Sequence, residues 1–312
     1  MKNKKKIVFN YEPLDYSKKA IELWKKNKFH YIKNDLSLSL SKDDFLRVEV
    51  LIVRLKFHIG IDIISKFPNL KTVISATTGS NHLDIELFNL KNIELITLRG
   101  HSDFLKEISS TAELTWALIM SISRNIFKSV EHVRNSGWNR DLFKGYQLRN
   151  KSIGIIGLGR IGLLIAQYAK AFGMSVYYFD PNVSVKNYKK MDSINNLASK
   201  VDFLSIHIHP DKENFKIINE EVISSMPKRS YLINTSRGEL WDEEAVVKYL
   251  KNGHLSGVAC DVLFNETELN KGVLWRNRNL YNILITPHIG GATYDAMWKC
   301  EEFLQHIYLS KN

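Results

Sequence analysis

The stretch IGIIGLGRIG, residues Ile153–Gly162, decides how this sequence is expected to fold. An isoleucine-rich run of strand character leads into the spacing G-x-G-x-x-G, and residues 160–172 then repeat apolar side chains at helical intervals. Gly173 is placed to end that helix, and a second strand pattern, 175–179, ends just before Asp180. A strand, a glycine turn, a helix and a strand that ends in an acid together predict a dinucleotide-binding unit.

Each residue of this motif has an expected task. Gly157 allows the tight turn, Gly159 lets the backbone approach a pyrophosphate, and Gly162 permits close packing of helix on strand. Asp180 accepts hydrogen bonds from ribose hydroxyls and repels a 2′-phosphate, which favours NAD over NADP. The alternative is that the glycines serve packing alone and that Asp180 is a turn residue before Pro181.

Strand and helix patterns alternate on both sides of the motif, which predicts parallel sheets and an α/β fold. Around the motif, six strands are expected at 153–156, 175–179, 203–208, 231–234, 257–260 and 282–286. Before it, strands are expected at 6–10, 50–54, 71–76 and 93–97, with helices at 17–27 and 60–67. Residues 102–133 keep helical spacing without Pro or Gly and predict one long helix that bridges two domains.

Composition excludes several classes of protein. The formal charge is +11, but the 44 basic residues are interleaved with 33 acidic ones, so we expect no nucleic-acid partner. No apolar run approaches the roughly 18 residues that span a bilayer, and no secretory signal is evident, so we expect no membrane association. Cys260 and Cys300 have neither disulfide-framework nor metal-ligand spacing, so we expect a cytoplasmic protein without a metal.

Charged side chains follow several of the predicted strands where those strands end. Arg237 lies just past strand 231–234, Asp261 ends the next strand, Glu266 lies on the loop after it, and His288 follows the last strand. The carboxyl ends of parallel strands lie along one edge of a sheet, where doubly wound folds bind their ligands. We therefore expect Arg237, Glu266 and His288 to face one cavity.

These residue types suit hydride transfer to a 2-oxo acid. An arginine fork binds a carboxylate and polarises the adjacent carbonyl. A histidine donates a proton to the alkoxide formed when hydride arrives, and a carboxylate on its far nitrogen fixes the tautomer and favours the protonated form. Taken singly, Arg237 could be a surface ion pair, Glu266 a solvated acid and His288 a cap or a packed core residue.

Over most of residues 99–295 the sequence resembles the D-isomer-specific 2-hydroxyacid dehydrogenases. The resemblance is carried by LRNKSIGIIGLGRIGLLIAQYAKAFGMSVYYFDP (148–181), LINTSRGELWDEEAVVKYLKNGHLSGVACDV (232–262) and TPHIGGAT (286–293). It implies that Arg237 binds and polarises the substrate, that His288 is the acid/base and that Glu266 is its partner. It also implies that Asp261 lies near the nicotinamide carboxamide. The remaining implied NAD-binding residues are Arg160, Ile161 and Thr235.

The resemblance also implies a domain plan. A Rossmann NAD-binding domain, residues 101–289, is expected to be inserted into a flavodoxin-like substrate domain made of residues 1–100 and 290–312. In the loop ATTGSNHLD (76–84), Thr78 and Gly79 are expected to bind the substrate carboxylate through backbone N–H groups, with an ordinary turn as the alternative. Arg54 is a further substrate-binding candidate, with a surface role as the alternative. A homodimer built around 103–133 is implied as well.

Three departures from the family pattern stand out. Thr267 replaces the proline that usually follows the catalytic glutamate, and Trp241 replaces a small apolar residue. The segment TLRGHSDFLKEISSTAE (97–113) is longer and more polar than its usual counterpart. We expect substrate choice to depend on this segment and on the N-terminal loops.

The sequence therefore predicts an NAD-dependent oxidoreductase that interconverts a 2-oxo acid and its D-2-hydroxy acid. One alternative is an NAD(H)-sensing scaffold on the same fold, because members of this family act as transcriptional corepressors. The other is a dehydrogenase of a different small anion, such as formate or phosphite.

Overall fold

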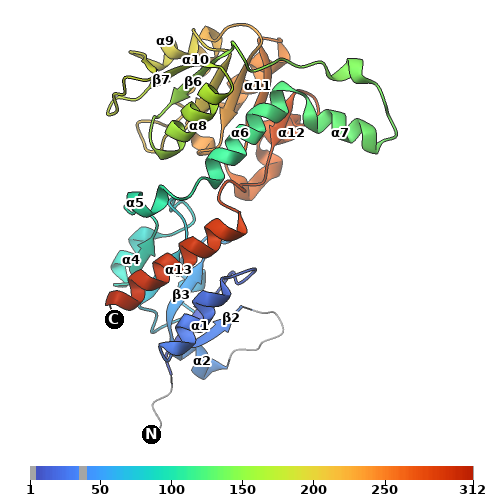
Figure 1. Cartoon of the computed structure of the whole chain (residues 1–312). Helices are drawn as coiled ribbons and strands as arrows, with labels where there is room; N and C mark the ends of the chain where they lie inside the picture. Colours follow the sequence, from blue (N-terminus) through green and yellow to red (C-terminus); the bar gives the residue numbers. More distant parts are fainter. Residues whose placement is uncertain (1–4, 35–40, 312) are drawn as a thin grey trace. The chain divides into compact units, whose positions relative to one another are not determined.

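The computed structural model describes residues 5–34 and 41–311 and forms two compact units (Figure 1). Unit 1 consists of Met1–Ile108 and Ala292–Asn312, and unit 2 consists of Ser109–Gly291. The chain leaves unit 1 after Ile108 rather than after residue 100, and it returns at Ala292 rather than at residue 290. Unit 2 is thus inserted between two pieces of unit 1.

In its described residues, unit 1 contains one parallel sheet of five strands in the order β2-β1-β3-β4-β5. This order is that of flavodoxin-like doubly wound folds. The strands are β1 (Ile7–Asn10), β2 (His30–Lys33), β3 (Val48–Val53), β4 (Thr72–Ser75) and β5 (Glu94–Thr97). The helices are α1 (Lys18–Lys26), α2 (Lys42–Arg47), α3 (Ile61–Ile64), α4 (Ile85–Leu90), α5 (Ser102–Leu105) and α13 (Tyr294–Lys311).

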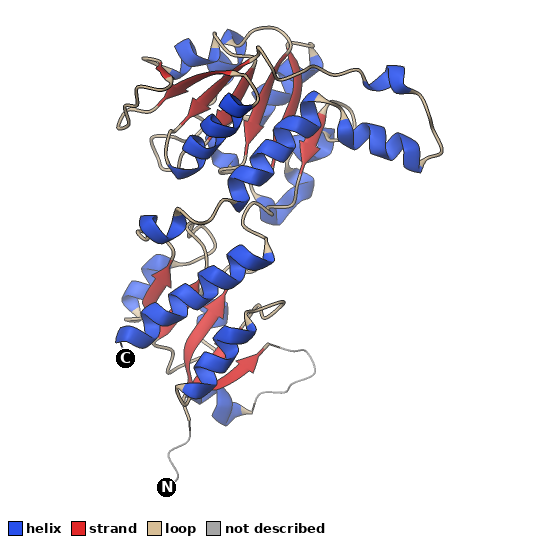
Figure 2. Ribbon diagram, in the orientation of Figure 1, coloured by secondary structure: helices blue, strands red, loops and turns tan. Residues whose placement is uncertain are grey.

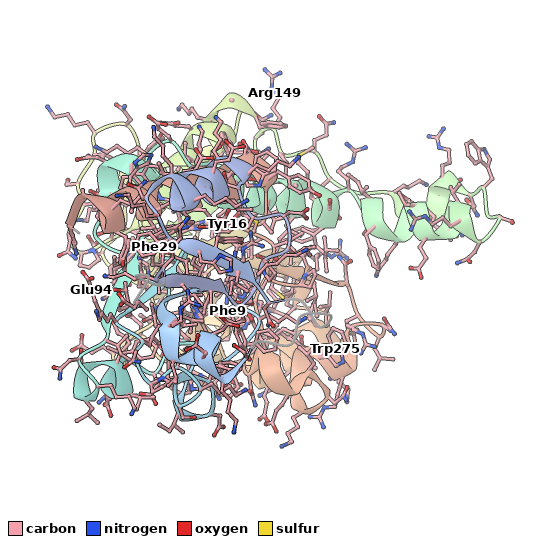
Figure 3. The ribbon with its side chains drawn as sticks, turned by 90° about the horizontal axis from the view of Figure 1, so that it is seen from below. Phe9, Tyr16, Phe29, Glu94, Arg149 and Trp275 are labelled. Carbon is pink, nitrogen blue, oxygen red and sulfur yellow. The ribbon has the colours of Figure 1, made fainter. Side chains whose placement is uncertain are left out.

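Two apolar clusters cover the two faces of this sheet. Trp24 of α1 and Leu304 of α13 pack on one face, whereas Phe67 and Phe88 pack on the other. Tyr16 and Phe9, both labelled in Figure 3, belong to these two opposite clusters. Helices on both faces explain why the inner strands β1, β3 and β4 are almost wholly buried and lack alternating polar residues.

Unit 2 contains a parallel sheet of seven strands in the order β12-β11-β10-β9-β6-β7-β8, which includes the dinucleotide-binding order 3-2-1-4-5-6. The strands are β6 (Ser152–Ile156), β7 (Ser175–Phe179), β8 (Lys189–Lys190), β9 (Phe203–Ile206), β10 (Ser230–Asn234), β11 (Leu255–Cys260) and β12 (Ile283–Ile285). All six strands expected around the glycine motif are present. The predicted α/β class with a Rossmann domain is confirmed.

Helices sandwich the second sheet as well (Figure 2). One face is covered by α6 (Ser110–Ser123) and α8 (Arg160–Ala171). The other face is covered by α9 (Ile194–Ala198), α10 (Glu220–Ser225), α11 (Glu243–Lys251) and α12 (Val273–Asn277). Three 3-10 turns complete the unit, namely η1 (Arg140–Phe143), η2 (Gly238–Leu240) and η3 (Glu266–Lys271).

The prediction of one long helix over 102–133 is wrong. The stretch forms α5, α6 and a third helix, α7 (Ile126–Arg134). The break between α6 and α7 occurs at Asn125, whose φ of 52° is left-handed, a conformation that asparagine adopts more readily than most residues. Apolar spacing continues across this break, so the pattern did not reveal it.

The two strands that the sequence did not predict are β2 and β8. Both lie at a sheet edge, and neither is a buried apolar run. Lys189 and Lys190 of β8 are exposed, and they pair with Tyr177 and Tyr178 of β7. No helix within 5–34 or 41–311 is long and apolar enough to span a membrane.

Candidate active site

The glycine loop of unit 2 adopts the geometry of a nucleotide cradle. Gly157 has a φ of 87°, and a Cβ atom there would lie 2.6 Å from the His207 carbonyl oxygen. A Cβ atom on Gly162 would lie 2.1 Å from the carbonyl oxygen of Gly157, so α8 packs on the turn more closely than any side chain allows. A Cβ atom on Gly159 would meet nothing within 4 Å, so this part of the loop is open to a ligand.

The N-terminus of α8 is suited to a phosphate. Its N-cap is Gly159, and no described side chain caps the first turn. The N–H groups of that turn and the helix dipole are therefore directed at the open side of the loop. Arg160 and Ile161 begin the helix, and both are half-buried.

Asp180 lies at the end of β7, beside this loop, and is 9% exposed. Its Oδ2 accepts a hydrogen bond from Leu158 N (2.8 Å) within the glycine loop. Its Oδ1 accepts from Asn182 N (2.8 Å) and Val183 N (3.0 Å). A carboxylate oxygen has two acceptor positions, so Asp180 can fix the loop and still accept from a ribose hydroxyl. The loop, the helix terminus and this carboxylate together fit NAD.

Arg237 follows β10 on a loop that side chains hold rigid. Asn234 Nδ2 donates to the Arg237 carbonyl oxygen (2.8 Å), and Ser236 Oγ donates to the Ile206 carbonyl oxygen (2.7 Å). The Arg237 side chain is half-buried, and its Nη1 donates to the Ser236 carbonyl oxygen (2.6 Å). Across the described ranges no carboxylate pairs with this guanidinium, which leaves its charge for a ligand.

The loop of Arg237 packs directly on the segment that leads to Glu266. A Cβ atom on Gly238 would lie 2.1 Å from the backbone carbon of Leu263, so the two backbones touch. The buried carboxylate of Glu243 holds the same segment by accepting from Phe264 N (2.9 Å) and Leu274 N (3.3 Å). Burial raises the pKa of Glu243, and these hydrogen bonds oppose the rise.

His288 and Glu266 form the expected pair. Nδ1 of His288 lies 2.7 Å from Oε2 of Glu266, while Oε1 of Glu266 accepts from Leu263 N (3.2 Å). The side chains are 25% and 38% exposed, so the pair is accessible from solvent. Because Nδ1 faces a carboxylate, it carries the hydrogen, and Nε2 is the ring nitrogen that can contact a ligand.

The backbone of His288 is strained and is held by Asp261. His288 has a φ of 54°, a left-handed conformation that is uncommon for a residue with a side chain. Its N–H donates to the Asp261 carbonyl oxygen (2.9 Å). Oδ1 of Asp261 accepts from Thr286 Oγ1 (2.6 Å) and Ile289 N (2.8 Å), and Oδ2 accepts from Gly290 N (2.7 Å).

Asp261 therefore positions the turn that carries His288. Burial raises the pKa of Asp261, and its hydrogen bonds to Thr286, Ile289 and Gly290 oppose the rise. Thr235, another implied cofactor residue, is buried with its Oγ1 2.7 Å from Thr115 Oγ1 of α6.

Unit 1 carries the other substrate-binding candidates at the carboxyl ends of neighbouring strands. Thr78 and Gly79 are half-buried on the loop after β4, and Thr77 Oγ1 donates to the Gly79 carbonyl oxygen (2.8 Å). In the part of the chain that the structure describes, no hydrogen bond uses the backbone N–H of Thr78 or Gly79. Arg54 follows β3 and pairs with Glu301 of α13, with Nη2 2.5 Å from Oε1.

The structure describes two of the three departures from the family pattern, the side chain of Trp241 and the 97–113 segment. Trp241 is 1% exposed and fills space within the core on the α9 to α12 face of the sheet. The side chain of Thr267 lies outside the described part of the structure. The 97–113 segment contains α5 and the connection between the units.

Two residues near the site were not predicted. Glu243 appears in the sequence as one of several acids at a helix start, which suggests only helix capping. His207 follows β9 directly beside Gly157, with Nε2 2.8 Å from Ser205 Oγ, and burial lowers its pKa to about 3. Its position after a strand of the nucleotide-binding sheet is the signal that could have singled it out.

Comparison with known proteins shows the family of this chain. A family model described as the NAD binding domain of D-isomer specific 2-hydroxyacid dehydrogenase matches residues 116–290. D-3-phosphoglycerate dehydrogenase of Methanocaldococcus jannaschii is 32% identical over 271 residues, which cover 84% of this chain and 50% of that protein. The chain therefore spans about half the length of that relative.

Two further relatives are covered over most of their length. Glyoxylate reductase of Thermococcus litoralis is 30% identical over 260 residues, which cover 80% of this chain and 76% of that protein. The structure of NAD-dependent formate dehydrogenase from Staphylococcus aureus in complex with NAD has a TM-score of 0.79 and 26% identity, and the match covers 98% of this chain and 95% of that one. The cofactor of unit 2 is NAD.

Proposed function

This chain belongs to the D-isomer-specific 2-hydroxyacid dehydrogenase family, and we propose that it interconverts a 2-oxo acid and its D-2-hydroxy acid with NAD. The observation that carries the proposal is the contact of 2.7 Å between His288 Nδ1 and Glu266 Oε2. A histidine held in this way presents Nε2 as a proton donor and acceptor, which the reduction of a carbonyl and its reverse require.

Bound NAD supplies the acceptor of hydride from the hydroxy acid, and its reduced form supplies the donor. We assign its binding to Gly157, Gly159, Arg160, Ile161 and Gly162 at the phosphates and to Asp180 at the ribose. Thr235 and Asp261 are assigned to the nicotinamide end. The N-terminus of α8, with Gly159 as its N-cap and no side-chain cap, supports the phosphate assignment.

In this proposal, residues of unit 2 carry out the proton transfer. In the reduction, protonated His288 gives its Nε2 proton to the carbonyl oxygen, and Glu266 stabilises the imidazolium before that transfer. Arg237 binds the substrate and stabilises the negative charge that develops on the oxygen, an interaction that grows toward the transition state. The lack of a carboxylate partner for Arg237 in the described chain supports this role.

The substrate carboxylate is assigned to Thr78 and Gly79 of unit 1. Their unused N–H groups support the assignment, because two adjacent backbone donors bind an anion well. The loop is braced by a chain of side chains in which Ser75 Oγ lies 3.0 Å from Thr77 Oγ1 and 3.2 Å from His82 Nε2. Arg54 lines the neighbouring strand end.

We propose that the partner of this chain is a second copy of the same chain. The segment from α7 to η1 lies apart from the sheet of unit 2 (Figure 1) and exposes more apolar surface than a solvated segment needs. Its exposed apolar side chains are Ile126, Phe127, Val130, Val133, Trp138 and Leu142. Trp138 is 92% exposed, which supports burial of this segment in a homodimer.

The same site argues against formate as substrate. Oxidation of formate releases carbon dioxide and forms no alkoxide, so it needs no proton donor at an oxygen. The pairing of Glu266 with His288 builds such a donor, which favours carbonyl reduction.

The experiment that tests the proposal is NADH oxidation by the purified protein with glyoxylate, pyruvate, hydroxypyruvate, 2-oxoglutarate and larger 2-oxo acids, with NADPH as control. Turnover of at least one with NADH, and a D-configured product, is expected. Tight NADH binding without any turnover would instead favour a scaffold that senses NAD(H).

A further inference from the structure

The charge of Arg54 is neutralised within unit 1. Its Nε and Nη2 atoms donate to Oε1 of Glu301 at 3.2 and 2.5 Å, and its Nη1 donates to the Leu14 carbonyl oxygen at 2.5 Å. The side chains of Arg54 and Glu301 are only 18% and 2% exposed. The pair is therefore shielded from solvent, and all three nitrogen atoms of the guanidinium have partners.

Glu301 is itself held in place. Its Oε2 accepts from Ser17 N at 2.9 Å, next to the first turn of α1, so the carboxylate is bound from two sides. A second buried carboxylate, Glu12, accepts from the backbone N–H of Arg54 and, at 2.7 Å, from that of Lys56. Two buried acids thus bind Arg54 at the carboxyl end of β3, Glu301 at the guanidinium and Glu12 at the backbone N–H.

The segments beside this pair expose apolar side chains. Leu14 is 76% exposed, and Leu55 and Phe57, which follow Arg54 on the same loop, are 43% and 37% exposed. Trp298 of α13 is 41% exposed, and its Nε1 donates to the Asp15 carbonyl oxygen at 2.7 Å, which ties it to the loop of Leu14. Lys56, between Leu55 and Phe57, places Nζ 5.3 Å from the centre of the Phe57 ring.

From these contacts we infer that the substrate carries an uncharged, apolar side chain. We infer also that the ion pair of Arg54 with Glu301, together with the nearby carboxylate of Glu12, excludes 2-oxo acids that have a second anionic group. The inference rests on the proposed function. It follows because β3 and β4 are neighbours, so a carboxylate held by Thr78 and Gly79 after β4 directs the rest of the substrate along the ends of the adjacent strands. An unpaired arginine there would bind a second carboxylate, whereas a neutralised one beside buried acids repels it.

The wild-type protein provides the first test. The values of kcat/KM with NADH are compared for 2-oxopentanoate and 2-oxoglutarate, which have the same chain length and differ by a terminal carboxylate. A preference of about 100-fold or more for 2-oxopentanoate is expected. Equal use of the two acids, or preference for 2-oxoglutarate, would overturn the inference while leaving the proposed function intact.

Glu301→Gln provides the second test, because it removes the countercharge of Arg54 without removing the side chain. The ratio of kcat/KM for 2-oxopentanoate to kcat/KM for 2-oxoglutarate should fall about tenfold, because the KM for 2-oxoglutarate becomes lower. Glu302→Gln is the matched control, since it changes the net charge equally on the next residue but contacts Ser17 Oγ at 2.5 Å rather than Arg54. The ratio of the two kcat/KM values in Glu302→Gln should equal the ratio in the wild type.

Two results of the variants would overturn the inference, namely an unchanged preference in a folded Glu301→Gln protein and equal changes in both variants. Circular dichroism checks folding, and if Glu301→Gln does not fold, the wild-type comparison decides alone. Failure of every 2-oxo acid to react would overturn the proposed function and, with it, this inference.

Discussion

Glu266 lies 22 residues before His288 in the chain, yet its Oε2 atom is 2.7 Å from the Nδ1 atom of His288. Glu266 follows β11 and His288 follows β12, and these strands are parallel neighbours, so their ends meet at one edge of the sheet. Asp261 holds His288 in place by accepting hydrogen bonds from the backbone of the turn that carries His288. The pair is thus a consequence of the topology of unit 2.

Glu266→Gln should keep the shape of this contact but remove its charge. Without the carboxylate, the imidazolium of His288 is less stabilised, and kcat for 2-oxo acid reduction should fall about 10-fold to 100-fold. The measurement is kcat with saturating NADH and 2-oxo acid, compared between Glu266→Gln and the wild type. An unchanged kcat would remove Glu266 from the proton-transfer step.

Arg237→Lys should be harmful although it preserves the charge. A lysine cannot make the two-pronged contact that binds a carboxylate and polarises a carbonyl. We expect kcat/KM for the 2-oxo acid to fall by about 100-fold or more while the Kd of NADH, measured by fluorescence, stays the same. Arg149→Lys, an exposed control before β6 in unit 2, should retain full activity. Full activity in Arg237→Lys would contradict the assigned role.

His207 should make the protein sensitive to acid. Its pKa in the folded state is lowered by burial from 6.5 to about 3, so below pH 6.5 the unfolded chain binds a proton that the folded chain does not. The neutral, buried His207 therefore contributes to the free energy of unfolding above pH 6.5. Below pH 6.5 this contribution is lost as the pH falls, at about 1.4 kcal/mol per pH unit.

Urea unfolding of wild type and His207→Gln between pH 7.5 and 4.5 measures this effect. Buried carboxyls such as Glu243, whose pKa burial raises, act in the opposite direction, so the difference between the two proteins isolates the histidine. The midpoint of the wild type should fall more steeply with acidification. Parallel curves for the two proteins would show that His207 is not the group responsible.

The apolar segment after α6 should control assembly. Replacing Val133 and Trp138 by serine removes exposed apolar surface, and the mass measured by light scattering should change from dimer to monomer. Leu90→Ser, which alters another exposed apolar residue, on α4 in unit 1, should remain dimeric. A monomeric wild type, or a serine double variant that stays dimeric, would contradict the proposed dimer.

The glycine motif and the strand ends could be predicted from the sequence because they obey local rules. Gly157 and Gly162 occupy positions that exclude a side chain, and the acids and bases of unit 2 follow buried strands. The edge strands β2 and β8 could not be predicted in this way, because an edge strand needs no apolar run. Lysines at such an edge also discourage pairing with other chains.

The contact between Arg54 and Glu301 illustrates what a sequence pattern does not show. The residues are 247 positions apart, and their pairing depends on where α13 crosses the end of β3. The same holds for Glu243, whose carboxylate binds backbone N–H groups of a distant loop. Such contacts follow from the packing of complete elements, which periodicity does not encode.

The central claim is that His288 transfers the proton in an NADH-dependent reduction, and His288→Ala tests it most directly. Its kcat with the best 2-oxo acid should fall by about 100-fold to 10,000-fold relative to wild type, while the Kd of NADH stays within about twofold. Undiminished turnover in this variant, with NADH binding intact, would contradict the claim.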